Sequence, residues 1–321
     1  MPLIAPASDQ ILSLCTGTGA LDMAVMRLTG AQLAYVAEKE PAPAKILAHH
    51  YPTTPNLADI TLIDWSQLMG QVDIITAGFP CQNISNAGDR EGINGSKSGI
   101  WANVADAIRI IRPRIIFLEN VAAIRTRGLG RVIGDLAGCG YDARWTSVRA
   151  STAAGASHER YRWFCEATPN AEGIRRTARR SESEGQQGAL RPSGCGGALA
   201  TAANGVRREG WGWHEPGEKR RDEPSDCRYS PAVWWGDYLP AIRRWERLTG
   251  QPAPMPTEIG PRGGRRLTAE FPEWMMGLPR GWITEVPGLT RNEKIEAAGN
   301  GVVWQQAYEA YRSLIWQQQN A

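Results

Sequence analysis

The chain has 321 residues and a globular composition, with 42% hydrophobic residues, 21% charged residues and a formal net charge of +3. That length fits one large domain or two ordinary ones. No run approaches the roughly 18 apolar residues of a membrane span. The opening MPLIAPASDQ lacks the basic start and long apolar region of a secretory signal peptide. We therefore expect a soluble cytoplasmic protein, which excludes the membrane and secreted classes.

The cysteines and the charge distribution narrow the classes further. The six cysteines form no CxxC pair and no regular spacing, so we expect neither a disulfide framework nor a metal site. The net positive charge belongs entirely to residues 166–265. Between 168 and 226 this segment is rich in Gly, Ser and paired arginines, and shows little apolar periodicity. We predict a long solvated loop over 177–197.

Strand-like and helix-like units alternate along the chain before this segment. Most of the strand candidates are continuous apolar runs rather than alternating ones, a pattern typical of a parallel sheet covered on both faces. We therefore predict a doubly wound α/β domain over residues 10–165. Its expected units are QILSLC, the helical LDMAVMRLTG, AQLAYVAE, a short helix after Pro41, a strand leading into LADIT, VDIITAG, a helix with Ile100, Val104, Ile108 and Ile111 on one face, and RIIFLENV.

In a doubly wound sheet, ligands bind at the carboxyl ends of the strands. Gly17 and Gly19 follow the first strand and would let the backbone approach a ligand, although such a pair is often only a turn. Glu38 ends the second strand, where a carboxylate commonly accepts hydrogen bonds from the ribose of an adenosine cofactor. Position 22 is Asp, so the third glycine of GxGxxG is missing. This favours S-adenosylmethionine, which has no phosphates, over a dinucleotide.

Further chemically competent groups follow the next strands. Asp59 would accept a hydrogen bond from the adenine amino group, although a turn or helix-cap role explains an aspartate at this position equally well. Cys81, directly after Pro80, is at the end of an apolar strand; a thiolate is a strong nucleophile, yet one cysteine at such a place is more often buried. Glu119 and Asn120 end the next strand, where a carboxylate is costly unless it is paired or at work. Two such groups at adjacent strand ends favour a catalytic site.

Six stretches occur in a characteristic order. They are CTGTGALD, GFPCQNIS followed by NAG, ENV, GASHERYRWF, RRLTAEFPEWMMGLPRGW and AAGNGVV. In this order they resemble the first cofactor loop, the catalytic loop, the base-handling glutamate, the QxRxR arginine pair, the recognition-orienting segment and the final GN-x-V motif of DNA (cytosine-5)-methyltransferases. The resemblance covers residues 11–165 and 264–316. His158 stands where the family usually has Gln.

The resemblance implies a Rossmann-like S-adenosylmethionine-dependent methyltransferase fold, mostly parallel and doubly wound, with a smaller target-recognition domain. It implies a catalytic and cofactor-binding domain at 1–167, a target-recognition region at 168–262, and a recognition-orienting segment with a returning helix at 263–321. The arginines and tryptophans of the middle region suit phosphates and bases. For PAVWWGDYLPAIRRWERLTG, a packed strand-turn-helix with a Trp core is the favoured explanation. We also expect one amphipathic helix from Asn300 to Trp316.

The family resemblance gives each catalytic residue a task. Cys81 would add to C6 of cytosine, so that C5 becomes nucleophilic enough to take a methyl group. Glu119 would hydrogen-bond ring N3, Arg162 would contact O2, and Arg160 would support this arrangement or the DNA backbone. The target cytosine must be flipped out of the duplex, and residues 85–98 would close over it.

We expect the partner to be double-stranded DNA, with a cognate restriction endonuclease if the protein belongs to a restriction-modification system, and we expect a monomer. Three alternatives stay open: an RNA cytosine-5-methyltransferase, a catalytically inactive nucleic-acid-binding relative, and a nicotinamide dehydrogenase. The predicted cofactor-binding residues are Thr16, Gly17, Thr18, Gly19, Ala20, Glu38, Lys39, Asp59, Ile60, Pro80, Asn300 and Gly301, and the predicted substrate-binding residues are Gln82, Ser85 and Asn120.

Overall fold

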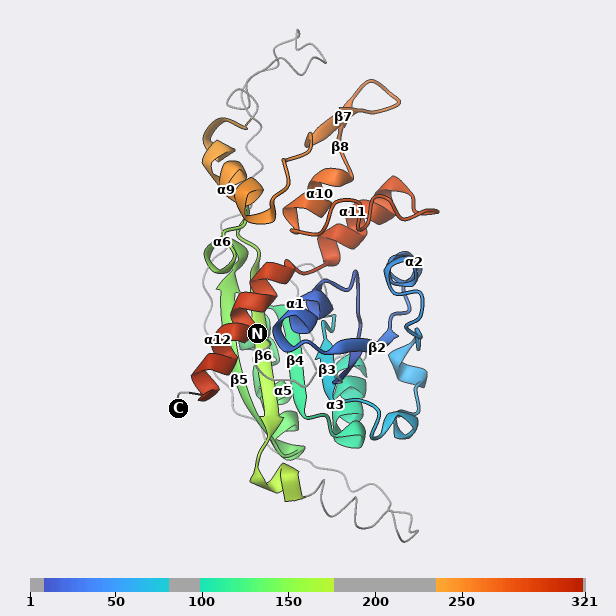
Figure 1. Cartoon of the computed structure of the whole chain (residues 1–321), viewed down its shortest axis with the longest axis vertical. Coiled ribbons are helices and arrows are strands. Elements are labelled where there is room, and N and C mark those ends of the chain that lie inside the picture. The colour runs from blue at the N-terminus through green and yellow to red at the C-terminus, as the bar shows by residue number, and fades with distance from the viewer. Residues whose placement is uncertain (1–8, 81–98, 176–234, 320–321) are drawn as a thin grey trace.

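A six-stranded sheet, in the order β2, β1, β3, β4, β6, β5, forms the centre of the molecule (Figure 1). The computed structural model describes residues 9–80, 99–175 and 235–319. The first four strands of the chain pair in parallel, whereas β6 is antiparallel to both β4 and β5. The mostly parallel α/β fold is thus confirmed. The strands are β1 (Gln10–Leu14), β2 (Gln32–Ala37), β3 (Ile74–Ala77), β4 (Ile115–Val121), β5 (Tyr141–Arg149) and β6 (Tyr161–Pro169).

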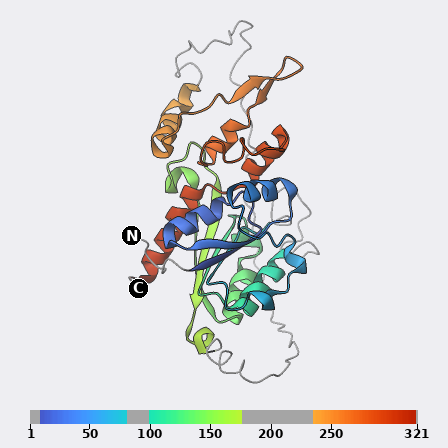
Figure 2. The ribbon, with the colours of Figure 1, turned by 45° about the vertical axis from the view of Figure 1, so that its right-hand side comes forward.

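Helices cover both faces of the sheet, as continuous apolar strands require. Successive strand side chains point to opposite faces, so Ile11 and Leu12 belong to two different apolar clusters. The first cluster includes residues of α1 (Ala20–Thr29) and α12 (Trp304–Gln319), and the second includes residues of α3 (Gly99–Ile111) and α5 (Leu129–Gly138) (Figure 2). The expected helix at 100–111 is confirmed as α3, in which Val104, Ile108 and Ile111 are buried.

One predicted strand is wrong. The segment before Asp59 forms no strand; its backbone pairs with β2 through an isolated parallel bridge between Val36 and Asn56. Pro52 and Pro55 lie in this segment, and a proline has no N–H to give to a strand ladder. A 3-10 helix over Ile60–Leu62 follows instead.

The amphipathic helix expected from Asn300 to Trp316 is present as α12, but it begins at Trp304 and not at Asn300. The chain forms α11 (Arg291–Asn300) and then α12, with a break at Gly301. Glycine has a low helix propensity; Gly299 lies in the last turn of α11 and Gly301 is the first residue of the break. As predicted, α12 is packed on the first domain: Ala307 and Leu314 are buried, and the helix contacts α1, β5 and β6. At the other boundary, β6 continues to Pro169, past the expected domain end at 167.

A smaller group of elements lies above the sheet in Figure 1. It contains α9 (Leu239–Thr249), the hairpin of β7 (Thr257–Ile259) and β8 (Arg265–Leu267), α10 (Glu270–Met275) and α11. Trp245 of α9 is fully buried and its Nε1 donates to the Trp274 carbonyl at 3.0 Å, so the Trp-core explanation holds for this helix.

The remaining elements are short connectors around these layers. They are α2 (Pro41–His50), α4 (Ile124–Arg127), α6 (Ala150–Ala153) and two further 3-10 helices at Trp65–Leu68 and Gly236–Tyr238.

Within the described ranges, none of the helices combines the length and apolarity needed to cross a lipid bilayer.

Candidate active site

The loop between β1 and α1 makes a tight glycine turn at the carboxyl edge of the sheet. Gly17 and Gly19 have φ angles of 58° and 79°, which favour glycine. A Cβ on Gly19 would also come within 3.3 Å of Leu47. Thr16 stabilises the turn by donating to the Ser13 carbonyl at 3.1 Å. The loop therefore brings its backbone and Thr18 to the N-terminus of α1, as the sequence predicts.

Glu38 is buried directly after β2 and holds this loop. Its carboxylate accepts hydrogen bonds from the backbone N–H of Gly17 and of Glu40, each at 2.8 Å. Burial raises the pKa of Glu38 and the two backbone donors oppose that shift. Each carboxylate oxygen can accept more than one hydrogen bond, so the group is still able to bind a ligand hydroxyl.

Asp59 has the helix-cap role that the sequence left open. Its Oδ1 accepts from the backbone N–H of Thr61 at 3.0 Å, and its Oδ2 lies 3.8 Å from Lys39 Nζ. Hydrogen bonds from the backbone N–H and the hydroxyl of Thr61 lower the pKa of Asp59, so its side chain is a carboxylate acceptor at neutral pH. Contact of Asp59 with adenine stays a prediction.

The residues of the predicted cofactor pocket fit a ligand that needs polar contacts but no phosphate cradle. Thr18 Oγ1 is buried and has no partner among the described residues. A Cβ on Gly17 would meet open space, whereas one on Gly301 would lie 3.2 Å from Thr18 Oγ1. The first loop and the GN-x-V segment, far apart in the sequence, thus meet beside an unsatisfied hydroxyl. Of the other predicted cofactor-binding residues, Ala20 and Ile60 are buried and Asn300 is exposed.

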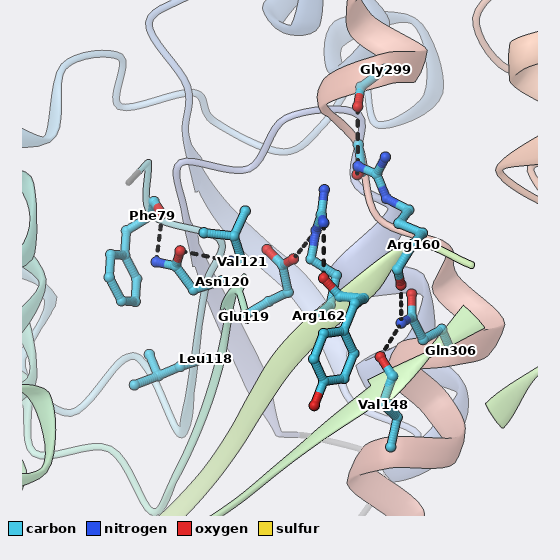
Figure 3. A network of polar contacts seen from close by, with 12 residues as sticks. Phe79, Leu118, Glu119, Asn120, Val121, Val148, Arg160, Arg162, Gly299 and Gln306 are labelled. Atoms are coloured by element: carbon cyan, nitrogen blue, oxygen red, sulfur yellow. Dashed lines mark hydrogen bonds and ion pairs between the residues drawn. The ribbon is translucent and has the colours of Figure 1, made fainter. Parts of the chain in front are cut away.

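Buried Glu119 and partly exposed Arg162 form an ion pair across two neighbouring strands (Figure 3). The antiparallel pairing of β4 with β6 aligns Arg162 with Val121, which is two residues beyond Glu119 and on the same face of the sheet. Arg162 Nε lies 3.1 Å from Glu119 Oε1, and Glu119 is 8% exposed. Burial raises the pKa of Glu119, while the charges of Arg162 and Arg160 oppose the rise. The carboxyl group is therefore easier to protonate than an ordinary glutamate.

Asn120 fixes the segment that leads into Cys81. Its Nδ2 donates to the Phe79 carbonyl at 3.0 Å, and its Oδ1 accepts from the Val121 N–H. A Cβ on Gly78 would lie 3.7 Å from Glu119 Oε2 and 3.7 Å from the Cys15 carbonyl. The chain thus runs between the cofactor loop and Glu119 immediately before exposed Pro80. Cys81, Gln82, Ser85, the closing loop at 85–98 and the solvated loop at 177–197 lie outside the described residues.

Arg160 is turned away from the Glu119–Arg162 pair (Figure 3). Its Nη2 donates to the carbonyls of Gly299, at 3.0 Å, and of Gly301. Both ring nitrogens of His158 are buried with no partner in the described part of the chain. Burial and the charges of the two arginines lower the His158 pKa to about 4, so the ring is neutral.

A family model described as C-5 cytosine-specific DNA methylase matches residues 10–194, more than half of the chain. This protein belongs to that family. Over 134 residues it is 37% identical to the type II methyltransferase M.CviJI of Paramecium bursaria Chlorella virus IL3A, which covers 41% of this chain and 36% of the viral protein. Over 124 residues it is 33% identical to a DNA N-6-adenine-methyltransferase of Escherichia phage P1, covering 35% of this chain and 16% of the phage protein.

These matches span only 36% and 16% of the relatives' own length. Among solved structures, the chain is similar to the Entamoeba histolytica methyltransferase EhMeth, with a TM-score of 0.59 and 13% identity over 97% of this chain and 99% of that one. At this identity the likeness concerns the fold, which agrees with the sheet and helix layers described above.

Of the three cysteines in the described part of this C-5 methylase family member, Cys15, Cys139 and Cys165, the first and the last are poor nucleophiles. Burial, aided by the charge of Glu38, raises the pKa of Cys15 to about 12. Burial also raises the pKa of Cys165 far above its usual range. Neither thiol ionises near neutral pH, so proximity to the cofactor loop does not make Cys15 a competitor for the nucleophile's role.

Sequence reasoning missed Trp282. Its Nε1 donates to the Thr18 carbonyl at 2.9 Å, and its ring stacks on His50 with centroids 3.6 Å apart. His50, which has no partner recognisable from the sequence and which we expected at the surface, also contacts the Trp282 carbonyl at 2.7 Å. No local signal joins residues 232 positions apart. The only pointer was that Trp282 ends the recognition-orienting stretch.

Proposed function

We propose that the protein transfers a methyl group from S-adenosylmethionine to C5 of a cytosine in a short, specific sequence of duplex DNA. The observation that carries this proposal is the ion pair of buried Glu119 with Arg162, which lies beside Gly78 and the segment leading into Cys81. A base recognised at N3 and O2 needs one proton donor and one cation side by side, and this pair supplies both.

Cys81 is the proposed nucleophile. Its thiolate would add to C6 of the cytosine, forming a carbon–sulfur bond and making C5 behave as an enamine carbon. C5 would then take the methyl group. Loss of the C5 proton to a base and release of the Cys81 thiolate would restore the aromatic ring. Asn120 supports this role by fixing Phe79, two residues before the thiol.

Glu119 and Arg162 would recognise the base and stabilise the charge that forms on it. A glutamate with a raised pKa is able to donate a proton or a short hydrogen bond to N3 as the thiolate adds. Arg162 holds the Glu119 carboxyl in place and would also donate to O2. A cytosine can reach Glu119 and Arg162 only when it is outside the base stack, so it would be flipped out of the duplex.

S-adenosylmethionine, when bound, supplies an electrophilic methyl group. The residues that would hold it are those of the β1–α1 loop, Glu38, Asp59, Ile60 and the Asn300–Gly301 segment. The unsatisfied Thr18 hydroxyl and the free acceptor positions of Glu38 support this assignment. Residues 168–262 would read the DNA sequence, and 263–321 would orient that region. A cognate restriction endonuclease would be the natural cellular partner.

The decisive experiment measures methylation of plasmid DNA in cells that express the protein. Bisulfite sequencing should find protected cytosines within one short sequence motif, and Cys81→Ala should remove them. Cys139→Ala, on the far end of α5, is the control for loss of a cysteine and should retain protection.

Mass spectrometry of the digested DNA distinguishes 5-methylcytosine from N6-methyladenine. Purified enzyme should act on duplex DNA and not on tRNA. Unprotected DNA from well-expressed, folded protein, or methylated adenine or tRNA instead, would overturn the proposal.

A further inference from the structure

We propose that Arg160 is a positioning residue that couples the base pocket to the cofactor loop, rather than a residue that contacts the substrate. The proposal rests on the function proposed above. It starts from the different directions of the two arginines of the QxRxR-like motif. Arg162 pairs with Glu119, whereas the guanidinium of Arg160 reaches Gly299 and Gly301 (Figure 3).

The link between α11 and α12 is joined to Arg160 in two ways. The Arg160 guanidinium donates to the two glycine carbonyls at the end of α11. In return, Gln306 in the first turns of α12 donates its Nε2 to the Arg160 carbonyl at 2.8 Å and to the Val148 carbonyl at 2.9 Å. The side chain and backbone of one residue therefore fix both sides of the helix break.

This arrangement continues into the cofactor loop. Gly301 is so close to Thr18 that a Cβ at Gly301 would lie 3.2 Å from the Thr18 hydroxyl. From its other side, the Thr18 carbonyl accepts the Trp282 indole N–H. A shift of the 299–301 segment would therefore move the wall of the pocket that contains the unsatisfied hydroxyl.

The same residue is connected to the base pocket through the backbone. Only Tyr161 separates Arg160 from Arg162, and Arg160 has a φ of 27°, an unusual value for a side-chain-bearing residue. The contacts of Arg160 thus hold a strained backbone at the start of β6, where Arg162 must be aimed at Glu119. Loss of these contacts would relax the strand end and change both pockets together.

The Nη2 of Arg160 is already engaged by two protein acceptors, whereas its Nε is buried with no partner among the described residues. Carbonyls at the C-terminus of a helix carry partial negative charge, which an arginine stabilises. A DNA phosphate would have to displace two such acceptors from one Nη2 atom. A substrate-contacting role would require the side chain to abandon the helix end.

The first test needs no ligand, so it decides on Arg160 even if the proposed function fails. Hydrogen exchange of the full-length protein is compared between Arg160→Met and Arg162→Met, which remove equal charge while keeping similar side-chain length. Arg160→Met should speed exchange of the amides at 299–303 by roughly tenfold or more, the effect of losing about 1.5–3 kcal/mol of charge-assisted hydrogen bonding. Arg162→Met should leave these amides unchanged.

The second test measures S-adenosylmethionine binding by calorimetry in the same two variants, without DNA. Arg160→Met should weaken binding about tenfold or more, and Arg160→Lys, which retains a cationic donor, should recover part of it. Arg162→Met should bind the cofactor as the wild type does while losing methyl transfer. Unchanged exchange at 299–303 in Arg160→Met, or unchanged cofactor binding with only a higher KM for DNA, would overturn the proposal. Failure of the wild type to bind the cofactor would instead refute the proposed function.

Discussion

Two opposing influences act on the Glu119 carboxyl. Burial favours its neutral form, and the arginines favour its charged form; the net result is a raised pKa. If the protonated form assists addition to the base, the rate of methyl transfer must fall as pH rises through this raised pKa. Glu119→Gln removes the transferable proton but keeps a hydrogen-bond donor.

We expect Glu119→Gln to slow single-turnover methyl transfer by about 10²–10⁴-fold, and to remove the decline on the alkaline side of the pH profile. Cofactor affinity should stay within about twofold, since the role proposed for this carboxyl group is to bind the base and not the cofactor. The control is Glu159→Gln, an exposed residue that pairs with Arg149. A full-rate Glu119→Gln variant, or one with the wild-type pH profile, would remove the proposed role of this group.

Asp22 is a second buried carboxyl, but it is part of the scaffold. It lies in the first turn of α1, is completely buried, and accepts hydrogen bonds from Ser13 Oγ at 2.9 Å and Thr76 Oγ1 at 2.5 Å. Burial, opposed by these hydroxyls, raises its pKa from 3.8 to about 6. The neutral form is favoured in the folded state, so this stabilisation is complete below pH 3.8 and is lost as pH rises through about 6.

Asp22→Asn should therefore gain stability relative to the wild type as pH rises from about 4 to 7, by at most roughly 3 kcal/mol, because the amide cannot ionise. Urea unfolding at several pH values measures the difference. Asp106→Asn, on the exposed side of α3, is the control and should show no such trend. A constant difference between Asp22→Asn and the wild type would mean that Asp22 does not titrate in this range.

At the scale of elements, α10 depends on one buried glutamate. Glu273 accepts hydrogen bonds from the backbone N–H groups of Gly281, Ile283 and Thr284 at 2.7–2.8 Å, and from the Thr284 hydroxyl. These contacts fold the segment after α10 back onto the helix and place Trp282 against Thr18. A carboxylate is suited to this position because the three backbone N–H groups and the hydroxyl that contact it are all hydrogen-bond donors.

Glu273→Gln places an amide N–H₂ against backbone donors, leaving at least one of them without an acceptor. We expect the free energy of unfolding to fall by about 2–3 kcal/mol, measured by urea denaturation. Glu270→Gln, exposed on the same helix, should cost less than about 0.5 kcal/mol. Equal stability of the two variants would show that the backbone groups find other partners.

The sequence predicted those elements whose apolar pattern matched their burial. VDIITAG, RIIFLENV and the helix at 100–111 bury nearly all the residues that carried the prediction. The strand before Asp59 failed because prolines there outweigh the apolar pattern, and the C-terminal helix starts at Trp304 rather than Asn300 because Gly301 interrupts the helical chain. The antiparallel position of β6, and with it the Glu119–Arg162 pair, depends on strand pairing, which is not a local property.

At the scale of the whole molecule, the site is assembled from segments that the chain order separates widely. Motif order was sufficient to predict that Glu119 and Arg162 act together. It could not show that Arg160 serves the helix break, because that contact joins residues 139 and 141 positions apart. The same limit applies to Trp282 on Thr18, which joins the recognition-orienting stretch to the cofactor loop.

The region expected to read DNA contacts the catalytic domain through α9. Arg244 of α9 donates to the carbonyls of Gly155, at 2.9 Å, and Ala156, at 3.3 Å, on the loop that leads to Arg160 and β6. Gly155 has a φ of 67°, and a Cβ there would lie 2.5 Å from Leu248 of the same helix. A shift of α9 would therefore move the backbone that leads to Arg160 and Arg162.

Arg244→Met should loosen this contact and lower the free energy of unfolding by about 1–2 kcal/mol, because two carbonyls lose their donor. The KM for DNA should rise severalfold, since α9 and the region before it would be less well oriented, while cofactor affinity without DNA stays unchanged. Arg243→Met is the matched control, because Arg243 pairs only with Glu246 on the same helix in the part of the chain that the structure describes. Steady-state methylation assays would contradict this account if the two variants raised the KM equally, because the effect would then follow from charge near the DNA and not from the seating of α9 on the loop before β6.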